Sequence, residues 1–98
     1  MKLEGIVSQD GKTVVTEATG LQIVYFIHTK LDGSKRKGFE VRALPNGETL
    51  GEYISITGAE LARDKILTKI KSMKSRAFVL MPEDKEALRL ERSLFYGE

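Results

Sequence analysis

Tyrosine and arginine side chains are the residues of this sequence best suited to bind another molecule. Four of them, Tyr25, Arg36, Arg42 and Tyr53, fall between residues 25 and 53. Tyrosine rings stack on the bases of single-stranded nucleic acids, and arginines hold phosphates. The same two residue types are enriched at protein–protein interfaces. The pattern therefore points to binding, with a protein or a nucleic acid as the partner.

A histidine and a glutamate are the strongest candidates for acid–base chemistry. His28 is the only histidine of the chain, and we expect it on the same sheet face as Glu52. General acid–base catalysis also requires a pocket and an oriented substrate, which neither residue supplies by itself. A polar position near a strand end for His28, and a one-residue bulge near Glu52, are the structural alternatives. We predict no enzyme activity, no catalytic residues, no metal and no cofactor.

The tripeptide Gly11-Lys12-Thr13 is similar to the end of a phosphate-binding loop. That loop needs a glycine five residues before Gly11, where this chain has Ile6, and a helix after it. Strand-like Val14 and Val15 follow instead. We therefore predict a hairpin turn here.

Composition restricts the other possibilities. The chain has 98 residues, enough for one domain spanning residues 1–98, and no cysteine, which excludes disulfides and favours the cytoplasm. Its longest apolar run, Ile23 to Ile27, is too short to span a membrane, and no signal peptide is expected. Residues 63–76 hold six basic residues and one acidic residue, whereas residues 77–98 hold three basic and five acidic residues.

Three turn dipeptides, Asp10-Gly11, Asp32-Gly33 and Asn46-Gly47, organise the first half of the chain. Type I′ hairpin turns favour Asn or Asp followed by Gly, so we predict strands near residues 2–8, 12–17, 21–30, 35–44 and 48–56. With two-residue loops, Phe26 lies opposite Phe39, and Ile54 lies beside Phe39 on the next strand.

This register gives the sheet an apolar face and a mixed face. The mixed face is the predicted binding site, and its exposure depends on whether another part of the chain covers it. Its members are Ile23, Tyr25, Ile27, Thr29, Arg36, Glu40, Arg42 and Tyr53.

The second half of the chain predicts a helix, a short strand and a helix. Thr57 and Glu60 fit a capping box, so the first helix should start there and run to about residue 74. Its apolar stripe would consist of Ala59, Ala62, Ile66, Ile70 and Met73. Residues 77–80 fit a buried strand pairing in parallel with an earlier strand, and Pro82 suits the start of the last helix. Phe95 and Tyr96 would pack at its end or form a docking tail.

Together these features predict an α+β fold: a five-stranded antiparallel meander followed by a helix, a short strand and a C-terminal helix. A partly open barrel like the oligonucleotide-binding fold is the alternative. For function we expect a non-enzymatic interaction or regulatory domain that acts through the mixed face on a protein partner or a second copy of itself. The alternative is nucleic-acid binding by the same face together with the basic segment 63–76.

Overall fold

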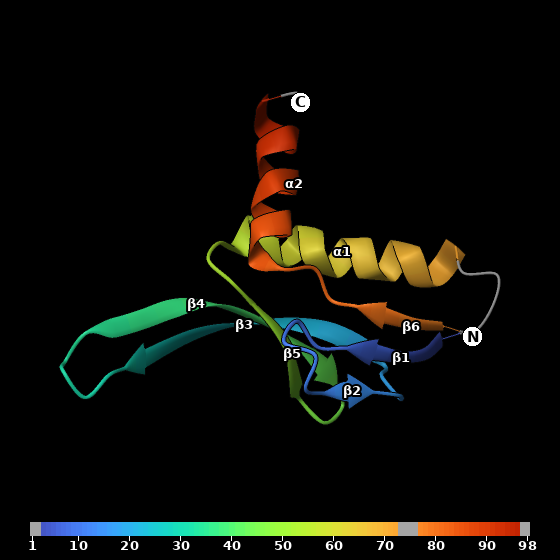
Figure 1. The fold of residues 1–98 in the computed structure, drawn as a ribbon, viewed down its shortest axis with the longest axis horizontal. Helices are drawn as coiled ribbons and strands as arrows, with labels where there is room; N and C mark the ends of the chain where they lie inside the picture. Colours follow the sequence, from blue (N-terminus) through green and yellow to red (C-terminus); the bar gives the residue numbers. More distant parts are fainter. Residues whose placement is uncertain (1–2, 73–76, 97–98) are drawn as a thin grey trace.

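Strands and helices follow one another in the predicted order. The computed structural model describes residues 3–72 and 77–96. Its elements are β1 (Leu3–Val7), β2 (Val14–Val15), β3 (Gly20–Thr29), β4 (Lys35–Leu44), β5 (Glu48–Tyr53), α1 (Ile56–Ser72), β6 (Ala77–Leu80) and α2 (Asp84–Tyr96). Two helices and two sheets make this a small α+β fold, as predicted (Figure 1).

The described strands form two three-stranded sheets in place of one five-stranded meander. One sheet has the order β2-β1-β6 and the other has the order β3-β4-β5, so the meander is limited to residues 20–53. β6 runs parallel to β1 on the side that β2 leaves free, so both sides of β1 are occupied. β3 consequently begins a separate sheet, and these strands do not close into a barrel.

The register of the β3–β4 hairpin differs by one residue from the prediction. Tyr25 lies opposite Phe39, and Phe26 lies opposite Gly38. A type I′ turn needs two residues at positive φ, but Gly33 alone in this turn has one, at 87°. The Gly33 N–H donates to the Lys30 carbonyl, which gives a three-residue loop. Because side chains alternate along a strand, this shift moves each β3 residue to the other face relative to β4.

The β4–β5 pair contains a bulge, the structural alternative that the sequence analysis gave for Glu52. The register shifts between Val41 and Arg42, and Tyr53, not Ile54, lies opposite Phe39. The loop before β5 is longer than the predicted two residues, because the Gly47 N–H donates to the Ala43 carbonyl. Tyr53 therefore faces the core, and Ile54 is 68% exposed.

Helix α1 begins two residues earlier than predicted. The Ser55 hydroxyl accepts the Gly58 N–H at 3.0 Å, so Ser55 and not Thr57 caps the helix. Ala59, Ala62 and Ile66 are buried against the sheets, as expected from their spacing. Met73 lies outside the described residues. In Figure 1, α1 lies along the two sheets and α2 projects away from it.

β6 confirms the predicted parallel strand but is not buried throughout. Phe78 lies opposite Gly5 and Leu80 opposite Val7, both on β1. Val79 is buried, whereas Phe78 and Leu80 are 60% and 58% exposed, because one face of this sheet is not covered by a helix. In the described part of the chain, no helix is long and apolar enough to span a membrane.

Candidate interaction surface on the β3–β4 arm

The outer half of the β3–β4 hairpin extends beyond the rest of the fold as a two-stranded arm (Figure 1). We define the arm as residues 25–39. β5 ends at Tyr53 opposite Phe39, so no described strand flanks β4 further along the arm. Most of its residues are exposed. An isolated two-stranded hairpin is at best marginally stable in water, so this element would gain from a third strand.

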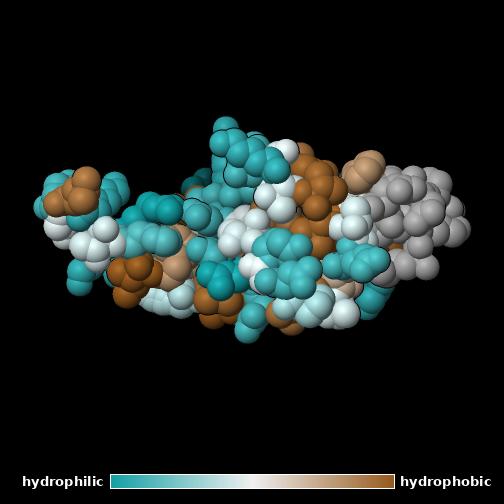
Figure 2. Space-filling view, turned by 90° about the horizontal axis from the view of Figure 1, so that it is seen from below, coloured by the Kyte–Doolittle hydropathy of each residue, from teal (hydrophilic) through white to brown (hydrophobic). Residues whose placement is uncertain are grey.

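One face of the arm is apolar and open to solvent. Tyr25 and Phe39 stack with ring centroids 5.3 Å apart and an interplanar angle of 29°. Tyr25 is 48% exposed, and Ile27, two residues further along β3, is 57% exposed. On the side away from α1, seen from below in Figure 2, hydrophobic side chains lie scattered among hydrophilic ones. Phe39 is half-buried and packs against the core, as cross-strand pairs of this kind normally do, whereas Tyr25 and Ile27 expose their outer surfaces.

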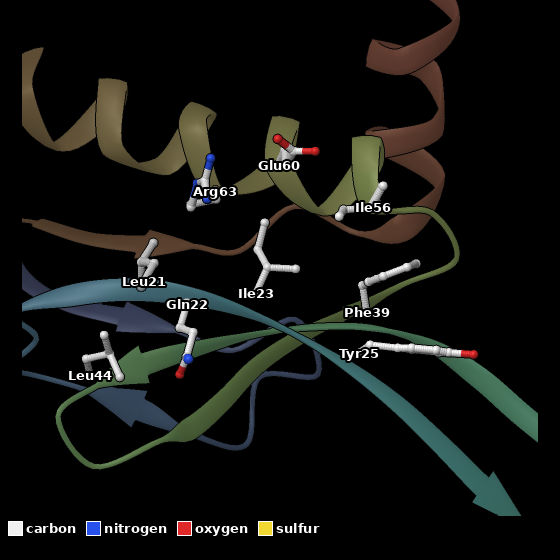
Figure 3. A pocket seen from close by; sticks show the side chains of 9 residues that line it. All are labelled: Leu21, Gln22, Ile23, Tyr25, Phe39, Leu44, Ile56, Glu60 and Arg63. Atoms are coloured by element: carbon white, nitrogen blue, oxygen red, sulfur yellow. The ribbon is translucent and has the colours of Figure 1, made fainter.

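An open groove continues this face toward the body of the protein. It has a volume of about 590 Å³ and lies between β3 and the N-terminal half of α1 (Figure 3). Ile23, Tyr25 and Phe39 contribute from the sheet, and Ile56, Glu60 and Arg63 contribute from the helix. The groove is apolar on the sheet side apart from Gln22, and carries one acidic and one basic residue on the helix side.

The backbone edge of β3 is also free. The Lys30 N–H donates to the Ser34 carbonyl, so these two residues form a hydrogen-bonded pair. Bonded and non-bonded pairs alternate in an antiparallel ladder. Residues of β3 with odd numbers, from Leu21 to Thr29, therefore direct their N–H and C=O groups away from β4. No described residue hydrogen bonds to these groups.

Arg36 lies on the opposite face of the arm. Its guanidinium pairs with the Glu52 carboxylate and lies 5.2 Å from the centroid of the Phe26 ring. The hydrogen bond that Arg36 donates to the Glu52 carboxylate raises the pKa of Arg36. The His28 ring is 5.0 Å from the same Phe26 ring. These contacts hold Arg36 on its own sheet, away from Tyr25.

Arg42 belongs to an ion pair that stabilises the sheet. Its Nε donates to the Glu40 carboxylate at 2.9 Å, and the Thr49 hydroxyl donates to the same oxygen at 3.1 Å. Glu40 is only 6% exposed. A buried carboxylate needs a paired cation, so Arg42 stabilises the fold by neutralising Glu40.

Tyr53 belongs to the core. It is 2% exposed, and its hydroxyl donates to the Pro82 carbonyl at 2.6 Å. Burial, with Asp84 and Glu86 nearby, raises the pKa of its phenol. Its ring is therefore not available to a partner.

The predicted site thus divides into three parts. Ile23, Tyr25 and Ile27 share one face of β3, Arg36 and Arg42 lie on the other face of the sheet, and Tyr53 is buried. The mixed aromatic–basic face is therefore not assembled as predicted. The prediction missed Phe39 as a neighbour of Tyr25, and the free backbone edge. The signal that could have given the correct register is Gly33, if it is taken as the third residue of a three-residue loop, Leu31-Asp32-Gly33.

The other predicted motifs have structural explanations. Gly11-Lys12-Thr13 lies in the β1–β2 hairpin, where the Ser8 N–H donates to the Thr13 carbonyl at 2.8 Å. The Ser8 hydroxyl and the Lys12 N–H bind the Asp10 carboxylate and lower its pKa. Glu52 is occupied by Arg36, and no hydrogen bond joins it to His28.

The basic segment 63–76 is described only through Ser72, so Lys74 and Arg76 lie outside the described residues. Arg63 pairs with the neighbouring Asp64 at 3.1 Å, and Lys65 pairs with Glu86 on α2. Two of the described basic side chains are thus already neutralised.

The chain matches no protein-family model, and comparisons with curated proteins and with solved structures found no match.

Proposed function

We propose that this protein is a non-enzymatic interaction domain that binds another protein through the β3–β4 arm. The observation that carries the proposal is the coincidence of two unsatisfied features on β3. Its outward backbone groups have no partner among the described residues, and Ile27 and Tyr25 expose apolar surface beside them. Strand addition to a sheet edge uses these two features together: main-chain hydrogen bonds give affinity and neighbouring side chains give specificity.

The sequence of β3 strengthens this proposal. β3 spans ten residues, pairs with β4 without a bulge, and contains no Lys, Arg, Asp, Glu or Pro. Natural proteins usually protect exposed edge strands with such charges, prolines or bulges. An edge without these devices is typical of a strand that has a partner. We also propose a cytoplasmic location, which the absence of cysteine favours.

Nucleic-acid binding has weaker support. Tyr25 is separated from Arg36 and Arg42, and both arginines are engaged by carboxylates of the same sheet. A reader of single strands needs its stacking rings and its phosphate-binding cations along one track.

Site-specific photocrosslinking tests the proposal. A benzophenone amino acid at Ile27 or Tyr25, activated in cells that make the protein naturally, should give a discrete protein adduct. Leu67 on α1 is a matched control, since it is also a partly exposed aliphatic residue, at 38%. An adduct at both arm positions but not at Leu67 supports the proposal. Absence of a protein adduct at both arm positions overturns it, and a nuclease-sensitive adduct would favour the nucleic-acid alternative.

A further inference from the structure

We infer that the partner of the β3 edge is a second copy of this chain, which adds its own β3 antiparallel about a two-fold axis at Tyr25. The inference rests on the proposed function, because both use the same edge. It names the partner and fixes the register. The product would be a continuous six-stranded antiparallel sheet formed from two β3-β4-β5 sheets.

The sequence of β3 matches itself in this register. With Tyr25 opposite the partner's Tyr25, Ile23 lies opposite the partner's Ile27, and Leu21 lies opposite the partner's Thr29. All of these are odd-numbered residues, whose backbone groups face the free edge, so each pair can exchange two hydrogen bonds. On the other face, Val24 lies opposite the partner's Phe26. Aliphatic and aromatic cross-strand pairs thus form on both faces, which stabilises an antiparallel ladder.

Charge also favours an antiparallel second copy. The tip of the arm is basic, with Lys30, Lys35 and Lys37 all exposed, and Asp32 as its acidic residue. The segment that leads into β3 carries the exposed Glu17. An antiparallel arrangement brings the basic tip of each copy to the end of β3 where the other copy has Glu17, whereas a parallel arrangement would bring the two basic tips together.

The dimer also supplies the third strand that the arm lacks. Beyond the buried pair Phe26 and Gly38, the arm is a two-stranded hairpin whose residues 27–37 are all exposed. In the proposed dimer, residues 26–29 of each arm lie along residues 21–24 of the other copy and gain a third strand. Each arm would therefore be stabilised by the body of its partner.

Sedimentation equilibrium of the full chain between about 1 and 300 µM tests self-association. A contact of one strand pair is small, so we expect a dimer with a Kd on the order of 10 µM. Tyr25→Lys places two lysines opposite each other at the axis and should raise the Kd at least about tenfold. Leu67→Lys, which adds the same charge on α1, should leave the Kd unchanged. A wild-type chain that is monomeric throughout this range overturns the inference.

Disulfide trapping tests the register, because the chain contains no cysteine. In Tyr25→Cys the two thiols would lie directly opposite, with Cα atoms about 5.5 Å apart, within disulfide range. In Ile27→Cys they would be offset by four residues, about 13 Å along the strand, and should not bond. Mild oxidation should therefore give covalent dimers of Tyr25→Cys and of the double variant Ile23→Cys/Ile27→Cys, but not of Ile27→Cys alone. Equal trapping of Tyr25→Cys and Ile27→Cys, or none of Tyr25→Cys, overturns the register.

The two proposals fail in different ways. A monomer that gives an arm-specific adduct with another protein in the photocrosslinking experiment overturns the second copy as partner and leaves the interaction domain in place. A monomer that gives no arm-specific adduct overturns both.

Discussion

The two edges of the β3-β4-β5 sheet differ in how their backbone groups are satisfied. At the β5 edge, the Gln9 side chain accepts the Glu52 N–H at 3.1 Å and donates to the Glu52 carbonyl at 3.2 Å, while the Gln9 N–H donates to the Leu50 carbonyl at 2.6 Å. The Ile54 N–H donates to Asp84 at 3.0 Å. The chain thus covers the β5 edge with its own residues, whereas it leaves the longer β3 edge open.

This difference separates a structural edge from the edge at which we propose binding. Covering β5 joins the two sheets and α2, because Gln9 lies between β1 and β2 and also donates to the Pro82 carbonyl at 3.3 Å. Substitutions at the β5 edge should therefore change the free energy of unfolding. Substitutions at the β3 edge should change association and leave the isolated fold intact.

The largest contrast is expected between Tyr25 and Tyr53. Tyr53→Ala removes a buried ring and its hydrogen bond to Pro82, so it should lower the free energy of unfolding by about 3–5 kcal/mol. Tyr25→Ala, at a site 48% exposed, should lower it by less than about 1 kcal/mol. Urea unfolding followed by circular dichroism at low protein concentration measures both. Similar losses for the two variants would contradict the assignment of Tyr25 to an open surface.

The next contrast uses two glutamines. Gln9→Ala leaves the backbone groups of Glu52 without their partner, so we expect a loss of about 1–3 kcal/mol. Gln22→Ala on exposed β3 is the matched control and should change the free energy of unfolding by no more than about 0.5 kcal/mol. The same unfolding assay applies. If Gln9→Ala lowered the free energy of unfolding as little as Gln22→Ala, the Gln9 hydrogen bonds would not stabilise the β5 edge.

These contrasts also explain what the sequence predicted well. Hydrophobic spacing located Ala59, Ala62 and Ile66 on the buried side of α1, and turn dipeptides bounded β3, β4 and β5 to within a few residues. Both signals are local. The sequence also predicted that Ile23, Tyr25 and Ile27 share a face, since alternation along one strand does not depend on its neighbour.

The register and the contacts between strands were less predictable. A glycine turn can close a loop of two or three residues, and that single residue decided whether Tyr25 lies beside Arg36 and Arg42 or on the other face. The division into two sheets depended on β6 returning through α1 to pair with β1, a contact between distant segments. Likewise, nothing local to Gln9 indicates that its side chain caps β5.

Alkaline pH provides a smaller, graded test of the structural edge. The pKa of Tyr53 is raised by burial and by Asp84 and Glu86, so the folded state keeps this phenol protonated when the unfolded chain releases its proton near pH 10. This stability is fully present below that pH and is lost as the pH rises, by at most about 1.4 kcal/mol per pH unit. Tyr53→Phe should remove this part of the slope in unfolding experiments between about pH 9 and 11. An unchanged slope would contradict burial of the hydroxyl.

The smallest effect on stability is expected at the β3 edge, where we propose binding. Ile27→Lys adds a charge to an exposed site of β3, the device by which edge strands usually avoid pairing, so it should change the free energy of unfolding of the monomer by no more than about 0.5 kcal/mol. Unfolding at about 1 µM keeps the proposed dimer dissociated, and Leu67→Lys controls for an added surface lysine. The same Ile27→Lys protein should lose self-association at high concentration. The opposite result, an Ile27→Lys protein that is strongly destabilised but still associates, would contradict these assignments. Ile27 would then be part of the core, and the dimer contact would lie elsewhere.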